Sequence, residues 1–297
     1  MMVHLPDTLA AEPALLFCIP GGGVHGGYFD LPAPFGFARA MTEAGHVVVA
    51  VDPPGTGESA SPNDGFAFTA DRVATLLHRA LMELRGQVLG GIPMRDLTPV
   101  GVGHSAGAML AIVQQAAFHD FQAMMLFCFG LGGLPEQLDD AHRSALAGPV
   151  PIRAQLPQLA RSRFGAAYMD LPHGSSDSPA AHALRAVRAP VATVIALHSM
   201  TPGSVAAEAA QIDVPVFVAV GRNDMTGPPH LLAAAYRACP DLTLFVSSTS
   251  GHHIFTSRDS TRLFARLHAW LPHFTDRIDR AGCLLGRAPP VAAATTH

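Results

Sequence analysis

The chain has 297 residues and a mass of 31.1 kDa, long enough for one large domain or two small ones. Hydrophobic residues make up 49% of the sequence and charged residues 14%, which excludes a disordered chain. The net charge of −4 comes from 23 acidic and 19 basic residues without a basic run, so the sequence lacks the charge pattern of a nucleic-acid-binding protein.

All 19 basic residues are arginine, because the sequence contains no lysine. The absence of lysine excludes a Schiff-base or pyridoxal phosphate enzyme, a P-loop nucleotide site and a Ser-Lys dyad. No apolar run reaches the roughly 18 to 20 residues that span a bilayer, and the N-terminus lacks the basic region of a signal peptide. We therefore expect a cytoplasmic protein with no membrane partner and no nucleic-acid partner.

Short aliphatic runs bounded by Gly, Pro, Asp or Asn recur along the chain. They predict buried strands of a parallel sheet at residues 14–20, 46–52, 98–104, 123–130, 214–220 and 242–248. Helical patterns are found between or after these strands, at residues 69–85, 106–119, 229–238 and 257–271. The alternation predicts an α/β fold with a doubly wound, mostly parallel sheet, in which ligands bind at the carboxyl ends of the strands.

One long stretch interrupts the alternation. Residues 131–208 contain eight prolines, short helical patterns and no convincing core strand. Because a compact domain does not leave such a length without structure, we predict that residues 131–208 form a helical cap inserted into an α/β core of residues 1–130 and 209–275. The tail, residues 276–297, is rich in Ala, Pro and Gly and is expected to be loosely ordered.

A serine in a turn of small residues is the strongest chemical signal. Ser105 lies within the sequence Gly-His-Ser-Ala-Gly, between a predicted strand and a predicted helix. This is the context of a G-x-S-x-G nucleophile elbow, in which the glycines let neighbouring backbones approach and leave the serine Oγ exposed at the end of the sheet. The pattern alone also fits a structural serine in a glycine turn, so the interpretation depends on its position.

A serine hydroxyl needs a base to take its proton, and the base needs an acid to orient it. Asp224 and His252 follow the last two predicted strands, in the order serine, acid, histidine that an elbow requires. Two adjacent histidines cannot both point into one site, and we predict His252 rather than His253 as the base. For Asp224 the alternative is an aspartate that only caps its own turn.

A glycine-rich loop follows the first predicted strand, and its backbone N–H groups are unobstructed. We predict that the N–H groups of Gly22 and Ala106 form the oxyanion hole, with Gly23 as the alternative to Gly22. The loop lacks the G-x-G-x-x-G sequence, the following helix and the later acidic residue of a dinucleotide site. No H-E-x-x-H or related spacing occurs, so we predict no metal and no cofactor.

Other reactive side chains have a simpler interpretation. The four cysteines have no close spacing, and Cys18 and Cys128 lie inside apolar runs, which predicts buried free thiols. His25 lies beside the predicted oxyanion donors and His104 directly precedes Ser105. For both histidines we expect a supporting role rather than a catalytic one.

With these residues in place, the chain resembles the α/β-hydrolase superfamily over about residues 14–271. The elbow, the acid loop that ends at Asp224 and the Gly-His pair at His252 are similar to the three catalytic motifs of that family. Two features depart from the family pattern. Pro20-Gly21 stands where His-Gly is common, and few residues precede the first predicted strand, so we expect a shortened first edge of the sheet.

The resemblance implies a serine hydrolase that cleaves a carboxylic ester or lactone of a mainly apolar small molecule through an acyl-enzyme. Ser105 would attack the carbonyl, His252 would accept its proton, and Asp224 would orient the imidazole. A thioesterase or acyltransferase of a biosynthetic pathway is one alternative, and a ligand-binding homologue with low turnover is another. The protein is expected to be a monomer or a homodimer.

Overall fold

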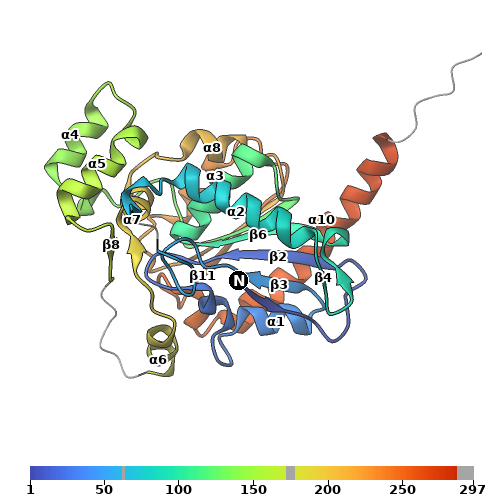
Figure 1. Cartoon of the computed structure of the whole chain (residues 1–297). Helices are drawn as coiled ribbons and strands as arrows, with labels where there is room; N and C mark the ends of the chain where they lie inside the picture. The colour runs from blue at the N-terminus through green and yellow to red at the C-terminus, as the bar shows by residue number, and fades with distance from the viewer. Residues whose placement is uncertain (62–63, 172–177, 286–297) are drawn as a thin grey trace, which may run out of the picture.

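The computed structural model describes residues 1–61, 64–171 and 178–285, with side chains described up to residue 272. Its centre is a seven-stranded sheet with helices on both faces (Figure 1), in the strand order β1-β3-β2-β6-β7-β10-β11. The strands are β1 Met2–His4, β2 Ala14–Ile19, β3 Val47–Ala50, β6 Thr98–His104, β7 Ala123–Phe127, β10 Val216–Gly221 and β11 Leu242–Ser247. All of them pair in parallel except β1, which pairs antiparallel with β3, so the predicted fold class is confirmed.

The apolar runs of the sequence are strands buried on both faces. Every residue of β2 is buried, and its side chains alternate between two hydrophobic clusters. Leu15 and Phe17 pack into the cluster on one face of the sheet, and Leu16 and Cys18 pack into the cluster on the other. Because successive side chains of a strand point to opposite faces, a central strand covered on both sides has no polar positions.

Helices cover the two faces in separate groups. The helices α2 Ala70–Arg85 and α3 Ala106–Phe118 pack on the face that receives Leu15, together with α8 Ala206–Gln211 and α9 Pro229–Leu232. The opposite face is covered by α1 Phe37–Glu43 and the first part of α10 Ser260–Leu285. At the start of α2 the Thr69 hydroxyl accepts a hydrogen bond from the Arg72 backbone N–H, as the predicted helix start at Thr69 requires.

Residues 131–208, the predicted cap, contain further helices and short strands. The helices are α4 Asp140–Ala147, α5 Ile152–Phe164, α6 Pro179–Ala186 and α7 Thr193–Met200, and the strands are β8 Tyr168–Met169 and β9 Val191–Ala192. The antiparallel pair of β8 and β9 was not predicted. In Figure 1, α4 and α5 extend beyond the side of the central sheet, whereas Ile195 of α7 packs into the core cluster beneath. The predicted cap, residues 131–208, therefore shares packing with the core through α7.

An arginine connects α5 to the core helices. The Arg153 guanidinium forms ion pairs with Asp71 of α2, at 2.6 Å, and with Glu208 of α8. The Arg153 and Glu208 side chains are 25% and 20% exposed and Asp71 is 61% exposed, so water screens the pair with Glu208 less than the pair with Asp71. The contact fixes the position of α5 relative to the face of the sheet that carries α2 and α3.

Short elements complete the described chain. A small hairpin pairs β4 Val88–Leu89 with β5 Ile92–Pro93. Single turns of 3-10 helix occur at Gly26–Asp30, Gly65–Ala67, Met94–Asp96, Pro135–Gln137, Ala233–Ala235 and Ile254–Thr256. Among the helices of the described residues, none has both the length and the apolar character that a membrane span needs.

The C-terminal helix differs from the prediction. It was expected to end near residue 271 and to be followed by a loosely ordered tail from residue 276, but α10 continues to Leu285. Pro272 lies inside α10, and the fixed φ of proline, about −65°, is compatible with helical backbone although proline donates no backbone hydrogen bond. The rest of the predicted tail, residues 286–297, lies outside the described residues.

The packing of α2 is tested by two equivalent truncations on one helix. Leu81 is fully buried and Leu76 is 39% exposed. We expect Leu81→Ala to lower the free energy of unfolding by about 2–5 kcal/mol, because it leaves a cavity in the core. Leu76→Ala is expected to change the free energy of unfolding by about 0.5 kcal/mol or less. Urea denaturation measures both, and equal losses for the two variants would contradict the orientation of α2.

Candidate active site

The turn between β6 and α3 holds Ser105 in a strained backbone conformation. Its φ of 53° and ψ of −121° lie outside the usual regions for a residue with a side chain. A Cβ atom at Gly103 would collide with the backbone of Ala108, and one at Gly107 would collide with the carbonyl of Ile19. The Ser105 N–H donates to the Phe127 carbonyl at 2.8 Å, which anchors the turn to the neighbouring strand β7.

The structure brings the three predicted side chains together. The Ser105 Oγ lies 2.9 Å from Nε2 of His252, and His252 Nδ1 lies 2.8 Å from Oδ1 of Asp224. Asp224 follows β10 and His252 follows β11, so the contacts form where parallel strands end at one edge of the sheet. The Asp224 side chain is fully buried, whereas the His252 side chain is 21% exposed.

The two hydrogen bonds define the roles of the ring nitrogens. Because a carboxylate accepts only, His252 Nδ1–H donates to Asp224, and Nε2 is left to accept from the Ser105 hydroxyl. Burial raises the pKa of the Asp224 carboxyl, but the hydrogen bond and charge of His252, with the adjacent Cys128 thiol, outweigh burial and bring this pKa below its ordinary value. Asp224 is therefore ionised at neutral pH, which favours positive charge on the imidazole.

His104 holds the loop that carries the base His252. Its Nε2–H donates to the backbone carbonyl of His252 at 2.8 Å, and its ring packs against Tyr28 with 4.5 Å between ring centroids. Burial, followed by the nearby His252 and His253, lowers the pKa of His104 well below its ordinary value. A neutral His104 orients the loop that carries His252 without placing a second positive charge beside it.

His253 points to a different place from His252. Its ring lies against Tyr28 and His104, with ring centroids 5.7 Å and 5.6 Å away. The hydrogen bond to Ser105 is made by His252. The structure therefore places His252, the predicted base, next to Ser105, whereas His253 packs against Tyr28 and His104.

Cys128 lies at this site, although the sequence analysis gave it no role beyond that of a buried thiol. It follows β7 with a φ of 54°, its N–H donates to the Ala219 carbonyl at 2.9 Å, and it is fully buried. Burial, and then the charge of Asp224, raise the pKa of the Cys128 thiol well above its ordinary value. The thiol is therefore a neutral neighbour of the carboxylate. The sequence placed Cys128 inside a predicted strand, and its place at the site follows from the end of β7 at Phe127 and from the strand order of the sheet.

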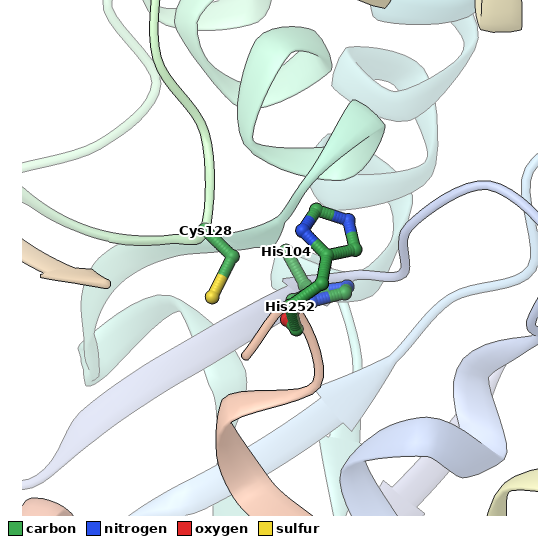
Figure 2. Close-up of side chains that lie close together, drawn as sticks. All are labelled: His104, Cys128 and His252. Atoms are coloured by element: carbon green, nitrogen blue, oxygen red, sulfur yellow. Dashed lines mark hydrogen bonds between the residues drawn. The ribbon is translucent and has the colours of Figure 1, made fainter. Parts of the chain in front are cut away.

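Three residues of this site are also the group, among the residues that the structure describes, that could together hold a metal ion. His104, Cys128 and His252 have ligand atoms within 4.8 Å of one another, and Figure 2 shows them coming from separate segments. Both nitrogens of His252 already bond to Ser105 and Asp224, and His104 Nε2–H bonds to a carbonyl. Nδ1 of His104 faces Gly21. A metal ion bound by His252 would have to break a hydrogen bond of the serine or the aspartate.

The predicted oxyanion donors face a common cavity. Gly22 and Ala106 both line a small cavity of ≈ 30 Å³ at the start of α3, and Gly23 is not among its lining residues. The Gly23 carbonyl accepts a hydrogen bond from the Ala189 N–H, which holds this part of the loop in place. The loop is fixed from below by Asp52, whose Oδ1 accepts from the Gly26 N–H at 2.7 Å. This arrangement favours Gly22 over Gly23 as the partner of Ala106.

Comparison with known proteins identifies the family. The model of the alpha/beta hydrolase family matches residues 16–293, which is nearly the whole chain. The chain belongs to the alpha/beta hydrolase family. A comparison with curated protein sequences gave no significant match.

Many solved structures share the fold at low sequence identity. A monoacylglycerol lipase from Paleococcus ferrophilus is 17% identical, with a TM-score of 0.63 over 92% of this chain and 100% of that one. A thermophilic esterase from Thermogutta terrifontis is 18% identical, with a TM-score of 0.60 over 92% and 94%. The N-acyl homoserine lactonase AidH is 17% identical, with a TM-score of 0.57 over 92% and 94%. At these identities the similarity establishes the fold.

The tight turn at Ser105 is tested by adding one methyl group. Gly107→Ala places its Cβ against the carbonyl of Ile19, which cannot move aside. We expect a loss of about 1–3 kcal/mol in the free energy of unfolding and at least about tenfold slower labelling of Ser105 by a fluorophosphonate. Intact-protein mass spectrometry and urea denaturation measure the two effects.

Gly148→Ala is the matched control, because Gly148 has a φ of −81° and only ordinary contacts around the added Cβ. This variant is expected to be labelled at the wild-type rate. Wild-type labelling and stability in Gly107→Ala would show that the close approach of α3 and β2 is not needed.

Proposed function

We propose that the protein is a serine hydrolase that cleaves a carboxylic ester or lactone of a mainly apolar substrate through an acyl-enzyme. The observation that supports this function best is the continuous hydrogen-bonded path from Ser105 Oγ through the His252 ring to Asp224. A nucleophile, a base and an orienting acid in this geometry suit acyl transfer. The lipase, esterase and lactonase of similar fold act in the same area of chemistry, as their names state.

In the first step, Ser105 Oγ attacks the substrate carbonyl carbon while His252 Nε2 accepts the hydroxyl proton. The ionised Asp224 stabilises the imidazolium that forms, and the N–H groups of Gly22 and Ala106 receive the oxyanion. His252 then gives the proton to the leaving alcohol oxygen as the carbon–oxygen bond breaks. The product is an ester between Ser105 and the acyl group.

In the second step, water attacks the acyl-enzyme and His252 accepts a proton from it. Collapse of the second oxyanion releases the carboxylic acid and returns the proton to Ser105. Apolar side chains line the cavity that contains Ser105, such as Phe129, and the cavity that contains Ala106, such as Leu110 and Ile195. These linings support a mainly apolar substrate. Neither step needs a cofactor.

Substitution of the three side chains tests the proposal. We expect Ser105→Ala and His252→Gln to lower kcat for p-nitrophenyl acetate by about 10⁴-fold or more, and Asp224→Asn by about 10⁴-fold. Ser105→Ala removes the nucleophile, and the other two changes leave the serine hydroxyl without an activated proton acceptor. Steady-state kinetics gives these values, and unfolding midpoints close to wild type identify variants that remain folded.

Full activity in a folded Ser105→Ala variant would contradict the proposed nucleophile. An added alcohol that captures the acyl group in preference to water would identify an acyltransferase instead. Stoichiometric labelling of Ser105 without ester turnover would identify a ligand-binding homologue.

A further inference from the structure

Two small cavities lie near Ser105, and one of them shares lining residues with a much larger groove. On the oxyanion side, the cavity of ≈ 30 Å³ is bounded by Gly22 and Ala106 and by the apolar side chains of Phe68, Leu110 and Ile195. Leu110 and Ile195 are 2% and 6% exposed, so packed side chains form the floor of this cavity. A volume of this size holds about two water-sized groups.

On the histidine side, Ser105 and His252 line a second cavity of ≈ 40 Å³. This cavity shares Gly133, Met225 and Thr226 with a much larger groove of ≈ 350 Å³. The shared residues make the two spaces adjoin. A substrate group that begins at His252 therefore lies next to the larger groove, whereas the oxyanion-side cavity shares no lining residue with that groove.

The larger groove is suited to an apolar group. Its lining includes Leu131, Leu231, Leu232 and Ala235, and Glu136 is its one ionisable lining residue among those the structure describes. Met225 and Leu231 are 54% and 59% exposed. Exposed large apolar side chains at the edge of a groove favour the binding of apolar ligands.

The position of the proton donor His252 indicates on which side of Ser105 the alcohol part and the acyl part of an ester lie. His252 Nε2 must reach the oxygen of the leaving alcohol, so the alcohol lies on the side that His252 lines. The carbonyl oxygen lies at the N–H groups of Gly22 and Ala106. The acyl chain is the remaining substituent of the carbonyl carbon, and the space on the side away from His252 is the cavity lined by Gly22, Ala106, Leu110 and Ile195.

Resting on the proposed function, we infer that the substrate is an open-chain ester of a short acyl group, about four carbons or fewer, with a large apolar alcohol. The Ser105 Oγ–acyl bond forms as the acyl–alcohol bond breaks, and the hydroxyl proton passes through His252 to the alcohol, which leaves along the groove. Water then releases the short carboxylic acid. A lactone joins its acyl part and its alcohol part in one ring, so these parts fit the small cavity and the groove less well than the separate parts of an open-chain ester do.

Two substrate series measure this asymmetry in the wild-type protein. The acyl series contains p-nitrophenyl acetate, butyrate, octanoate and dodecanoate, and kcat/KM is expected to fall at least about tenfold from butyrate to octanoate. The alcohol series contains methyl, hexyl and dodecyl acetate, followed by acid release, and kcat/KM is expected to rise at least about tenfold from methyl to dodecyl acetate. γ-Dodecalactone is included as the lactone.

Three variants assign the effects to the two spaces. Ile195→Ala enlarges the small cavity and is expected to raise the ratio of octanoate to butyrate hydrolysis about tenfold. Ala235→Trp narrows the groove and is expected to lower the ratio of dodecyl to methyl acetate hydrolysis about tenfold. Ala44→Trp is the matched control, because Ala44 is also a half-buried alanine in a groove, of ≈ 360 Å³, that contains no residue of the site. It is expected to leave both ratios unchanged.

The outcomes separate this inference from the proposed function. No hydrolysis of any ester or lactone would overturn the proposed function and the inference with it. Faster hydrolysis of octanoate than butyrate, or of the lactone than the acetates, would overturn the inference and leave a serine hydrolase in place. An unchanged alcohol ratio in Ala235→Trp would overturn the groove assignment. If Ala235→Trp does not fold, Leu231→Asp at its exposed position tests the same groove.

Discussion

The pair of hydrogen bonds on the two nitrogens of the His252 ring is the interaction on which the role of the fold depends. These bonds join residues separated by 147 and 28 positions in the sequence. Local structure cannot bring such residues together. The parallel sheet does so, because the strands before Ser105, Asp224 and His252 end at one edge and because β7 fixes the spacing between them. The buried apolar strands thus determine the geometry of a small polar cluster.

The charges around the His252 ring favour transfer of the Ser105 hydroxyl proton to this ring. Asp224 is buried and ionised, which costs desolvation energy that the bond to His252 offsets. His104 and Cys128 are also buried beside it, and burial keeps both neutral. The imidazole therefore has a negative partner in Asp224, and its buried neighbours His104 and Cys128 add no positive charge. This local field supports the development of positive charge on His252 when it accepts the serine proton.

Much of this site was predictable from the sequence, because each of its main residues follows an apolar run long enough to recognise as a strand. The glycines around Ser105 also have a local steric reason that can be recognised in the sequence. Other features depend on tertiary contacts. The two-residue strands β8 and β9 have no periodicity to detect, and the place of Cys128 follows from the order of β6, β7 and β10 in the sheet. The preference for Gly22 over Gly23 as a predicted donor depends on which of them lines the cavity, which the sequence does not show.

The most direct measurement of the central claim is the chemical identity of the intermediate. The protein is mixed with p-nitrophenyl acetate, quenched in acid within the first turnovers, digested and analysed by mass spectrometry. Our account predicts an acetyl group on the Oγ of Ser105, formed in the wild-type protein and absent from a folded His252→Gln variant. Acetylation of another residue that forms and decays at the rate of turnover, with Ser105 unmodified, would contradict the account.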